Sequence, residues 1–250
     1  MLRPLPSPPP PGPLTRLHRL AARALPPLLD LLYPPRCAAC DDLGPEPFCR
    51  SCADSLVPSP VGCPVCGVPL DDALLPALRP RRCGPCREAA PPFALARAPF
   101  LHGGALAEAI YALKYRDRPE VARPLGVLFE AVEPPRADVV CPIPLHPQRL
   151  RTRGYDQAGL LANHAARRFG LPLAHLLIRT RPTPAQVSLG RAERARNLRG
   201  AFTAAATVTG LRVCLIDDVL TTGATAAEST RALLRAGAAR VEVRTLSRAP

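Results

Sequence analysis

The stretch from Arg212 to Thr225 reads Arg-Val-Cys-Leu-Ile-Asp-Asp-Val-Leu-Thr-Thr-Gly-Ala-Thr, and it joins an apolar run, two carboxylates and a loop of small residues without a break. Residues 213–216 predict a buried strand, and the sequence from Ala224 onward predicts a helix. The loop between them therefore lies where a strand leads into a helix. This junction indicates an α/β fold.

Two kinds of ligand group follow each other in this junction. The hydroxyls and backbone amides of Thr221, Thr222, Gly223 and Thr225 suit a phosphate at the positive end of a helix. Asp217 and Asp218, which we expect at the carboxyl end of the strand, suit paired sugar hydroxyls or a hydrated Mg²⁺. An ordinary strand–turn–helix corner with a threonine N-cap is the alternative. That alternative explains one threonine, but it does not explain the acidic pair.

The rest of the second half alternates between predicted strands and helices. Strands are expected near residues 138–143, 173–178, 212–217 and 240–246, and one apolar helix face ends at Lys114. This rhythm predicts a largely parallel sheet flanked by helices. In such sheets ligands bind beyond the carboxyl ends of the strands, where the Asp217 loop and the segment from Pro142 would both emerge.

The segment from Cys141 to Gln157 leaves its predicted strand through prolines and then presents Arg149, Arg151 and Arg153. Guanidinium groups in a fixed array suit a pyrophosphate, although a solvated basic loop is the alternative. His146 is expected to stabilise the turn, with proton transfer as the other interpretation. A polar stretch at residues 179–202 predicts either a mobile active-site loop or a surface excursion.

Composition sets limits on the class of protein. The chain has 250 residues, 47% of them apolar, and a net charge of +13, which favours anionic partners. Lys114 is the only lysine, so the basic charge reflects a chain-wide preference for arginine. Residues 1–30 are expected to form a proline-rich tail and a basic helix that is too interrupted for a membrane span, and we expect a cytoplasmic protein.

Eight of the ten cysteines form four Cys-x-x-Cys pairs, namely Cys37/Cys40, Cys49/Cys52, Cys63/Cys66 and Cys83/Cys86. Such pairs predict two structural Cys₄ zinc sites, with consecutive or interleaved pairing. A disulfide scaffold would need an oxidising compartment, and glycine and proline beside several pairs favour metal over redox chemistry. We therefore expect a double zinc ribbon at residues 31–92 and a larger domain at residues 93–250. Cys141 and Cys214 are expected to be buried and inert.

The junction at residues 212–225 resembles the phosphoribosyl-pyrophosphate (PRPP) signature of type I phosphoribosyltransferases. With the cysteine pairs, the whole chain after about residue 28 resembles the ComF family, which joins a double zinc ribbon to a phosphoribosyltransferase-like domain. The other segments that carry the resemblance are Leu31-Leu-Tyr-Pro-Pro-Arg-Cys37, Leu113-Lys114-Tyr115, Pro142-Ile-Pro-Leu-His-Pro, Arg153-Gly-Tyr-Asp-Gln157, and Gln186 with Arg194 and Asn197. The family usually has Phe-Asn where this chain has Tyr155 and Asp156.

The resemblance implies that Mg²⁺-PRPP binds with its ribose on Asp217 and Asp218. Its 5′-phosphate would lie on the loop formed by Leu220, Thr221, Thr222, Gly223, Ala224 and Thr225. Arg149, Arg153 and Lys114 would neutralise the departing pyrophosphate. It also implies a role in natural competence, with single-stranded DNA, a helicase and recombination mediators as partners, and an acceptor that is not named.

The other hypothesis is a binding protein without turnover. Because aromatic residues make up only 4% of the chain, we expect its DNA contacts to be mainly electrostatic.

Overall fold

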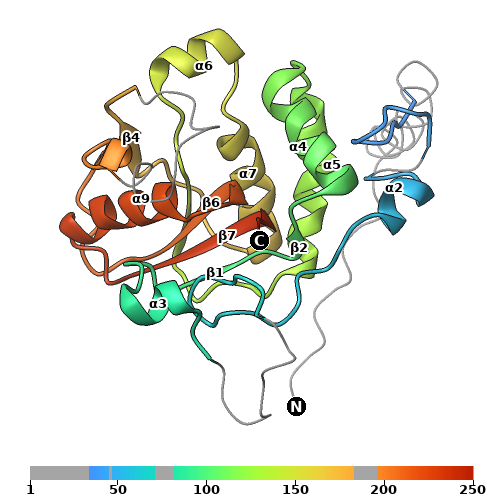
Figure 1. Ribbon diagram of the computed structural model, residues 1–250. Coiled ribbons are helices and arrows are strands. Elements are labelled where there is room, and N and C mark those ends of the chain that lie inside the picture. The colour runs from blue at the N-terminus through green and yellow to red at the C-terminus, as the bar shows by residue number, and fades with distance from the viewer. Residues whose placement is uncertain (1–33, 45–46, 71–80, 183–195, 250) are drawn as a thin grey trace, which may run out of the picture.

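The computed structural model describes residues 34–44, 47–70, 81–182 and 196–249. Within them a five-stranded parallel sheet has the order β1–β7–β6–β3, and β2 also pairs with β7 (Figure 1). Its strands are β1 (Leu95–Arg97), β2 (Phe100–Leu101), β3 (Val139–Pro142), β6 (Arg212–Leu220) and β7 (Arg240–Arg248). The predicted parallel sheet is confirmed.

Two strand predictions were wrong in detail. β6 does not end at Asp217, because the apolar Val219 and Leu220 continue the ladder with β7 as far as Arg248. The strand expected at residues 173–178 does not join the parallel sheet beyond one bridge between Leu173 and Val140. Pro172 has no amide hydrogen with which to extend that ladder. Instead β4 (Leu177–Arg179) pairs antiparallel with β5 (Phe202–Ala204) in a separate two-stranded sheet.

Helices cover both faces of the parallel sheet. α4 (Gly104–Tyr115), α5 (Ala122–Val127) and α7 (Gln157–Phe169) share one core with Cys214 and Ile216, whereas α9 (Ala224–Arg235) shares the other with Val213 and Leu215. This division follows from the alternation of side chains along β6. The remaining helices are short: α2 (Arg50–Asp54), α3 (Gly84–Glu88), α6 (Pro147–Arg153), η2 (Pro119–Val121) and η3 (Leu128–Ala131).

The two strand cysteines behave as expected. Cys141 and Cys214 are fully buried, one facing each core. Burial raises the pKa of each thiol to about 12, so both remain protonated near neutral pH. These thiols are packing groups, as predicted.

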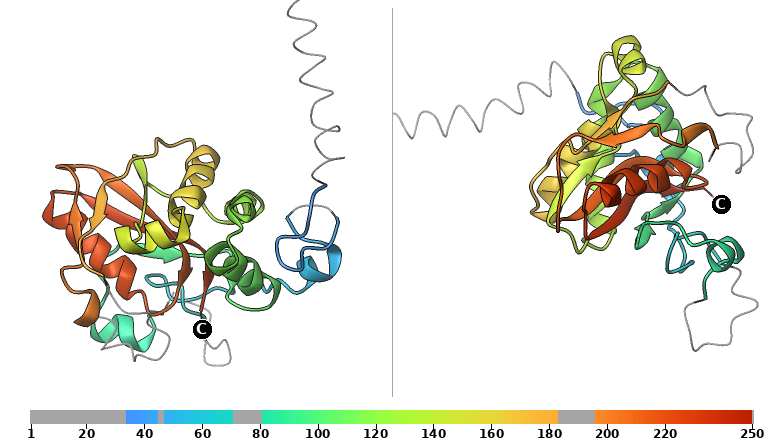
Figure 2. Two further views of the ribbon diagram at one scale, coloured as in Figure 1. Left: turned by 90° about the horizontal axis from the view of Figure 1, so that it is seen from above. Right: turned by 90° about the vertical axis from the view of Figure 1, so that its left-hand side faces the viewer.

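Each cysteine-rich segment extends a different core. Cys37 and Phe48 pack into the core beneath α4, α5 and α7, whereas Cys63 and Cys86 pack with Phe93 into the core on the α9 side. Figures 1 and 2 accordingly show α2 beside α4 and α5, and α3 at a separate place near β1. The two ribbons therefore flank the sheet and hold different parts of it.

Some predictions fall outside the described residues. They are the tail and basic helix at residues 1–30 and the central part of the expected active-site loop, which includes Gln186, Leu189 and Arg194. Among the residues that the structure describes, no helix combines the length and the apolar character needed to cross a membrane.

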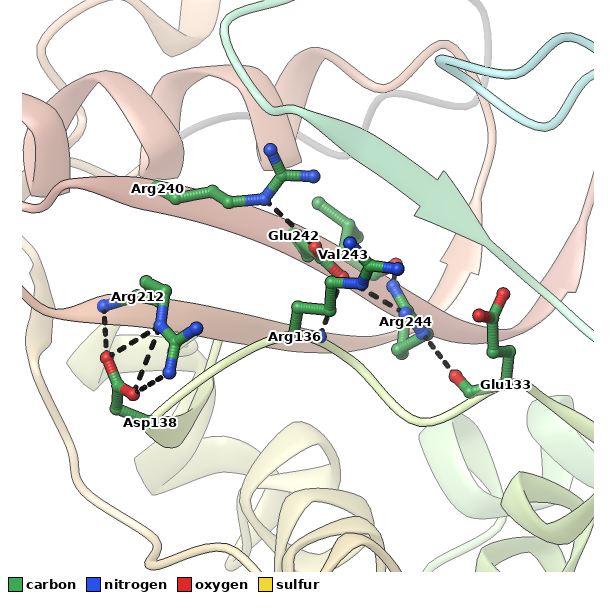
Figure 3. Close-up of polar contacts among 8 residues, drawn as sticks. All are labelled: Glu133, Arg136, Asp138, Arg212, Arg240, Glu242, Val243 and Arg244. Carbon is green, nitrogen blue, oxygen red and sulfur yellow. Dashed lines mark hydrogen bonds and ion pairs between the residues drawn. The ribbon is translucent and has the colours of Figure 1, made fainter.

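A buried ionic network lies on the N-terminal half of β7, away from the carboxyl end of the strand (Figure 3). The side chains of Glu242 and Arg244 are each only 2% exposed, and Arg244 Nη2 lies 3.1 Å from Glu242 Oε2. Arg240 Nε donates to Glu242 Oε1 at 3.0 Å, and the Arg136 amide donates to Oε2 at 3.3 Å. Arg244 Nε also donates to the Glu133 carbonyl. Donors therefore reach both carboxylate oxygens of Glu242.

Replacing Glu242 with alanine should lower the free energy of unfolding by about 3–5 kcal/mol, because the Arg244 guanidinium would stay buried without its carboxylate. Urea unfolding followed by circular dichroism measures the loss. Asp138→Ala is the matched control, since it breaks the neighbouring but half-exposed Asp138–Arg212 pair and should have a much smaller effect. Equal losses in the two variants would contradict a role for the network in stability.

Candidate functional site

The loop between β6 and α9 has the geometry of an anion site. β6 ends at Leu220, α9 begins at Ala224, and Gly223 takes a φ of +76°, which favours glycine. The Ala224 amide donates to Thr222 Oγ1 at 3.4 Å. Thr221 is exposed, and Thr222 and Thr225 are half-buried, so a ligand can reach the first turn of α9. Amides in this turn lack intrahelical partners and suit a phosphate.

The acidic pair lies on β6 itself, immediately before this loop. Asp218 is buried, and its Oδ1 lies 2.8 Å from Nζ of Lys114, which comes from the last turn of α4. Burial alone would lower the pKa of Lys114, but the charges of Asp218 and Asp217 raise it. The only lysine of the chain is thus a charged partner for the acidic pair.

The second carboxylate oxygen of Asp218, Oδ2, gives the clearest indication that the site binds a ligand. Oδ2 is buried, and no hydrogen-bond donor from the described residues reaches it. A buried carboxylate oxygen without a donor is costly, and a ribose hydroxyl or a water held by Mg²⁺ would satisfy it. The donor set is therefore suited to Mg²⁺ with a sugar phosphate, which are hard, oxygen-rich ligands.

Asp217 is electrostatically frustrated. Burial raises its pKa to about 7, and the charge of Asp218 adds to this rise while Lys114 opposes it. The amide of Asp218 donates to Asp217 Oδ1 at 2.9 Å. A cationic or hydroxyl-bearing ligand would relieve the repulsion between the two carboxylates.

The first zinc ribbon, which contains the cluster from Cys37 to Cys52, and the junction between α6 and α7 hold α4 in place, and with it Lys114. Ser55 Oγ donates to the carbonyl of Cys52 at 2.8 Å and accepts the Ala105 amide at 3.3 Å, at the start of α4. Close to the other end of α4, the Tyr155 hydroxyl donates to the carbonyl of Leu113 at 2.6 Å. A phenylalanine at this position could not make that bond.

The arginine segment after β3 forms the short helix α6. His146 caps it by accepting the Gln148 amide at 3.2 Å, so the predicted turn-stabilising role is confirmed. Arg149 and Arg153 are four residues apart and share one face of the helix, while Arg151 lies on another. Arg153 donates to Gln157 Oε1 at 2.5 Å and lies 5.4 Å above the ring of Tyr115. Arg153 is thereby held next to the residue that follows Lys114.

Arg179, at the end of β4, begins the polar stretch that the sequence analysis interpreted as a loop, but no role of its own was predicted for it. It is buried, and its pKa is lowered by burial and by the positive charge of Arg149, while Asp217 raises it. The two guanidiniums and the acidic pair are therefore within electrostatic reach of one another. Neighbouring guanidiniums of this kind suit a polyanion such as pyrophosphate.

Arg248, at the end of β7, is a second residue that the sequence did not indicate. Its buried guanidinium donates through Nη1 to the carbonyls of Leu220 at 2.9 Å and Thr221 at 2.7 Å, and through Nε to the carbonyl of Cys66 at 3.2 Å. One side chain thus joins the loop between β6 and α9, which we call the phosphate loop, to the second zinc ribbon, which contains the cluster from Cys63 to Cys86.

His102 is the third residue of this kind. Its Nδ1 lies 3.0 Å from Ser247 Oγ, and its pKa is lowered by burial and by Lys114, with Asp218 opposing. Arg179, Arg248 and His102 all lie far from residues 212–225 in the sequence, and no local motif marks them.

The cysteines form two Cys₄ clusters. One contains Cys37, Cys40, Cys49 and Cys52, and the other Cys63, Cys66, Cys83 and Cys86, with the sulfurs of each cluster within 4.8 Å of one another. Cys40 and Cys49 sulfurs are 3.8 Å apart, and those of Cys66 and Cys83 are 3.6 Å apart. A tetrahedron with Zn–S bonds of about 2.3 Å requires a similar spacing. The consecutive pairing is confirmed, and four sulfurs per site make both zincs structural.

Comparison with known proteins supports both halves of the chain. Residues 28–87 match the double zinc ribbon domain, and residues 156–250 match the phosphoribosyl transferase domain. The chain is 33% identical over 215 residues to DNA utilization protein YhgH of Escherichia coli K12, covering 82% of this chain and 92% of that protein. It is 31% identical over 147 residues to competence protein ComFC of Bacillus subtilis, covering 57% and 59%.

The chain belongs to the ComF family.

A further relative and a solved structure are similar to parts of the chain. Competence protein F of Haemophilus influenzae is 35% identical over 116 residues, which cover 45% of this ComF protein and 51% of the relative. Among solved structures, glutamine PRPP amidotransferase of Bacillus subtilis aligns with a TM-score of 0.35 and 25% identity, over 54% of this chain and 27% of that one.

Asparagine at position 217 should stabilise this ComF protein in the absence of ligand. The pKa of Asp217 rises from 3.8 to about 7 on folding. Between these two pH values the folded state binds more protons than the unfolded state. The free energy of unfolding therefore falls as the pH rises through this range. Asp217→Asn should therefore melt higher at pH 8, by about 2–4 °C for each kcal/mol gained, and the gain should shrink toward pH 5.

Asp218→Asn provides the contrast, because it leaves the buried ammonium of Lys114 without its carboxylate and should lower the melting temperature at pH 8. Differential scanning fluorimetry of both variants at the two pH values checks the signs. Shifts in the same direction would refute the electrostatic assignment.

Proposed function

We propose that this ComF protein binds Mg²⁺-PRPP at the β6–α9 junction and transfers its phosphoribosyl group to an acceptor. The observation that carries the proposal is the Asp218 carboxylate, which is buried, paired through one oxygen with Lys114, and without a donor from the described residues on the other. The residue that carries this oxygen lies on β6, shortly before the loop that leads into α9. The N-terminus of α9 is accessible and suits a phosphate.

In this proposal each part of PRPP meets a separate set of groups. The ribose hydroxyls, with Mg²⁺, lie on Asp217 and Asp218. The 5′-phosphate lies on the loop whose residues are Leu220, Thr221, Thr222, Gly223, Ala224 and Thr225. Gly223 supports this assignment, since its positive φ lets the backbone turn toward the ligand at the start of α9.

The arginines serve the leaving group. The acceptor's lone pair forms a bond to C1 of the ribose as the bond from C1 to the pyrophosphate oxygen breaks, and pyrophosphate leaves with both electrons of that bond. Arg149 and Arg153 stabilise its growing charge, and the buried Arg179 beside Arg149 joins them. Lys114 contributes mainly through its ion pair with Asp218, and Mg²⁺, when bound, would shield the pyrophosphate oxygens.

The cellular setting follows from the names of the relatives, which are a DNA utilization protein and two competence proteins. We propose that the protein acts in the cytoplasm in the use or uptake of DNA. A competence helicase and recombination mediators are its proposed protein partners.

Isothermal titration calorimetry of the zinc-loaded protein with PRPP tests the pocket. Binding should require Mg²⁺, because the pyrophosphate and the acidic pair are both anionic. Asp218→Asn should weaken binding at least tenfold, since a buried charged hydrogen bond contributes about 1.5–3 kcal/mol.

Glu228→Gln is the matched control, because Glu228 is also a buried carboxylate, but its oxygens accept hydrogen bonds from the Gly200 amide and the Arg231 guanidinium rather than from Lys114. Its affinity for PRPP should stay close to that of the wild type. Absence of PRPP binding by folded wild-type protein would refute the proposed function.

A second candidate function, binding of single-stranded nucleic acid, is favoured by one surface. Tyr111 and Tyr115 on α4 are 49% and 65% exposed, and their ring centroids are 5.0 Å apart. The guanidinium of Arg116 lies 5.2 Å from the first ring and that of Arg153 lies 5.4 Å from the second. Stacking rings flanked by arginines suit unpaired bases and their phosphates. The low aromatic content of the chain predicted few platforms for stacking bases. Two of its four tyrosines nevertheless lie together on this surface.

Changing both tyrosines to serine should weaken binding of a single-stranded oligonucleotide about tenfold or more, since stacking contributes about 1–3 kcal/mol per base. Fluorescence anisotropy over a series of salt concentrations measures it. The slope against salt should be unchanged in this variant, whereas Arg153→Gln should reduce it by about 0.7 through the loss of one phosphate contact.

Val127→Ser is the control, because Val127 is 45% exposed on the neighbouring helix α5 but has no aromatic ring. If the tyrosine variant binds as well as the Val127 variant, the surface has no part in nucleic-acid binding.

A further inference from the structure

A cavity of about 620 Å³ lies between the second ribbon and the phosphate loop. One wall consists of Leu220, Thr221, Thr222 and Gly223, and the opposite wall includes the ribbon cysteines and Pro85. Its volume lies within the range of about 300–1,000 Å³ that is usual for small-molecule sites.

The position of this cavity relative to the proposed PRPP site is informative. In the proposed site the ribose lies on Asp217 and Asp218, and the 5′-phosphate lies on the loop that follows them at the end of β6. Among the described residues, the loop borders the cavity, whereas the acidic pair, Lys114 and the α6 arginines do not. The cavity therefore continues the site beyond the 5′-phosphate, at the end opposite to the reacting C1 carbon.

The lining indicates what the cavity can hold. Val68, Pro91 and Phe93 contribute apolar surface, and the aromatic ring and the proline faces suit a flat group such as a nucleobase. Thr221, Thr222 and Arg248 lie at the side shared with the loop. Although the guanidinium of Arg248 donates to backbone carbonyls, its positive charge remains and favours an anion at this side.

We propose that the cavity between the second ribbon and the phosphate loop binds a nucleoside that is joined to the 5-phosphate of the bound ribose. The ligand class is a ribose 5-phosphate whose phosphate is joined to a nucleoside, through a diphosphate as in a dinucleotide or through a phosphodiester as at the 3′ end of an RNA strand. This inference rests on the proposed function, because it uses the same ribose and phosphate subsites. It adds that the natural ligand extends past the 5′-phosphate.

ADP-ribose is the probe, because it is ribose 5-phosphate that carries AMP on its phosphate, and ribose 5-phosphate alone is the reference. Calorimetry with Mg²⁺ should show ADP-ribose binding at least tenfold more tightly than ribose 5-phosphate. Adenylyl-(3′→5′)-adenosine has a phosphodiester in place of the diphosphate and an adenine on C1 of its 3′-terminal ribose, so it represents an RNA end. Tighter binding of this compound than of ADP-ribose indicates RNA as the source of the ligand, and the reverse order indicates a free dinucleotide. PRPP is titrated in parallel.

Pro91→Trp fills the cavity from a half-buried position outside the cysteine pairs. It should remove the advantage of ADP-ribose over ribose 5-phosphate while leaving PRPP affinity within twofold. Pro92→Trp is the matched control, since the next residue is also half-buried but does not line the cavity. Zinc content and melting temperature of both variants establish that they fold.

The outcomes are separate for the two proposals. Wild-type protein that binds PRPP but shows no preference for ADP-ribose overturns this inference and leaves the proposed function intact. The same holds if Pro91→Trp keeps the preference, or if it abolishes PRPP binding while Pro92→Trp does not, since the cavity would then be part of the PRPP site. Failure of the wild type to bind PRPP at all is instead a failure of the proposed function.

Discussion

The ion pair between Lys114 and Asp218 is the interaction on which the organisation of the site depends. It joins the end of α4 to β6, and it places the ammonium of Lys114 against the buried carboxylate of Asp218. Without the ammonium, the buried Asp218 would lie next to Asp217 without its ion-pair partner, which is costly for a buried group. The strand can therefore present an acidic pair to a ligand only because a helix from another part of the chain delivers one cation.

The zinc ribbons contribute to the same site by two routes. The first ribbon reaches α4, and hence Lys114, through Ser55, which bonds to the carbonyl of Cys52 and to the Ala105 amide. The second reaches the phosphate loop through Arg248, which bonds to the carbonyl of Cys66. In both cases the zinc ligand's own backbone is the contact. The metal ions thus have a structural part in shaping the site while remaining outside the chemistry.

The sequence predicted those features whose determinants are local. The strand–loop–helix order of residues 212–225 and the two cysteine clusters are encoded by spacing alone, and the structure confirms both. The sequence likewise predicted that His146 stabilises its turn, and the structure shows that it does so as the N-cap of α6. Lys114 was selected because it is the single lysine and because it lies in the segment Leu113-Lys114-Tyr115 of the family resemblance, but its partner Asp218 became visible only in the fold.

What the sequence could not show depends on tertiary pairing. Arg179, Arg248 and His102 reach the site from β4, β7 and the end of β2. Nothing in the neighbours of Arg248 and His102 distinguishes them, and Arg179 was marked only as the first residue of the polar stretch at residues 179–202. The length of β6 was underestimated because the aspartates look like a strand end, whereas β7 supplies a partner ladder beyond them. The pair of tyrosine rings becomes visible only when the turns of α4 place them on one exposed face.

A crystal structure of the zinc-loaded protein grown with PRPP and Mn²⁺ would test the central claim most directly, since Mn²⁺ replaces Mg²⁺ and gives an anomalous signal. The account predicts the ribose hydroxyls or a metal-bound water within hydrogen-bond distance of Asp218 Oδ2, the Lys114 contact retained, and the 5′-phosphate on the first turn of α9. Ligand density elsewhere, with Asp218 Oδ2 still without a partner, would contradict it.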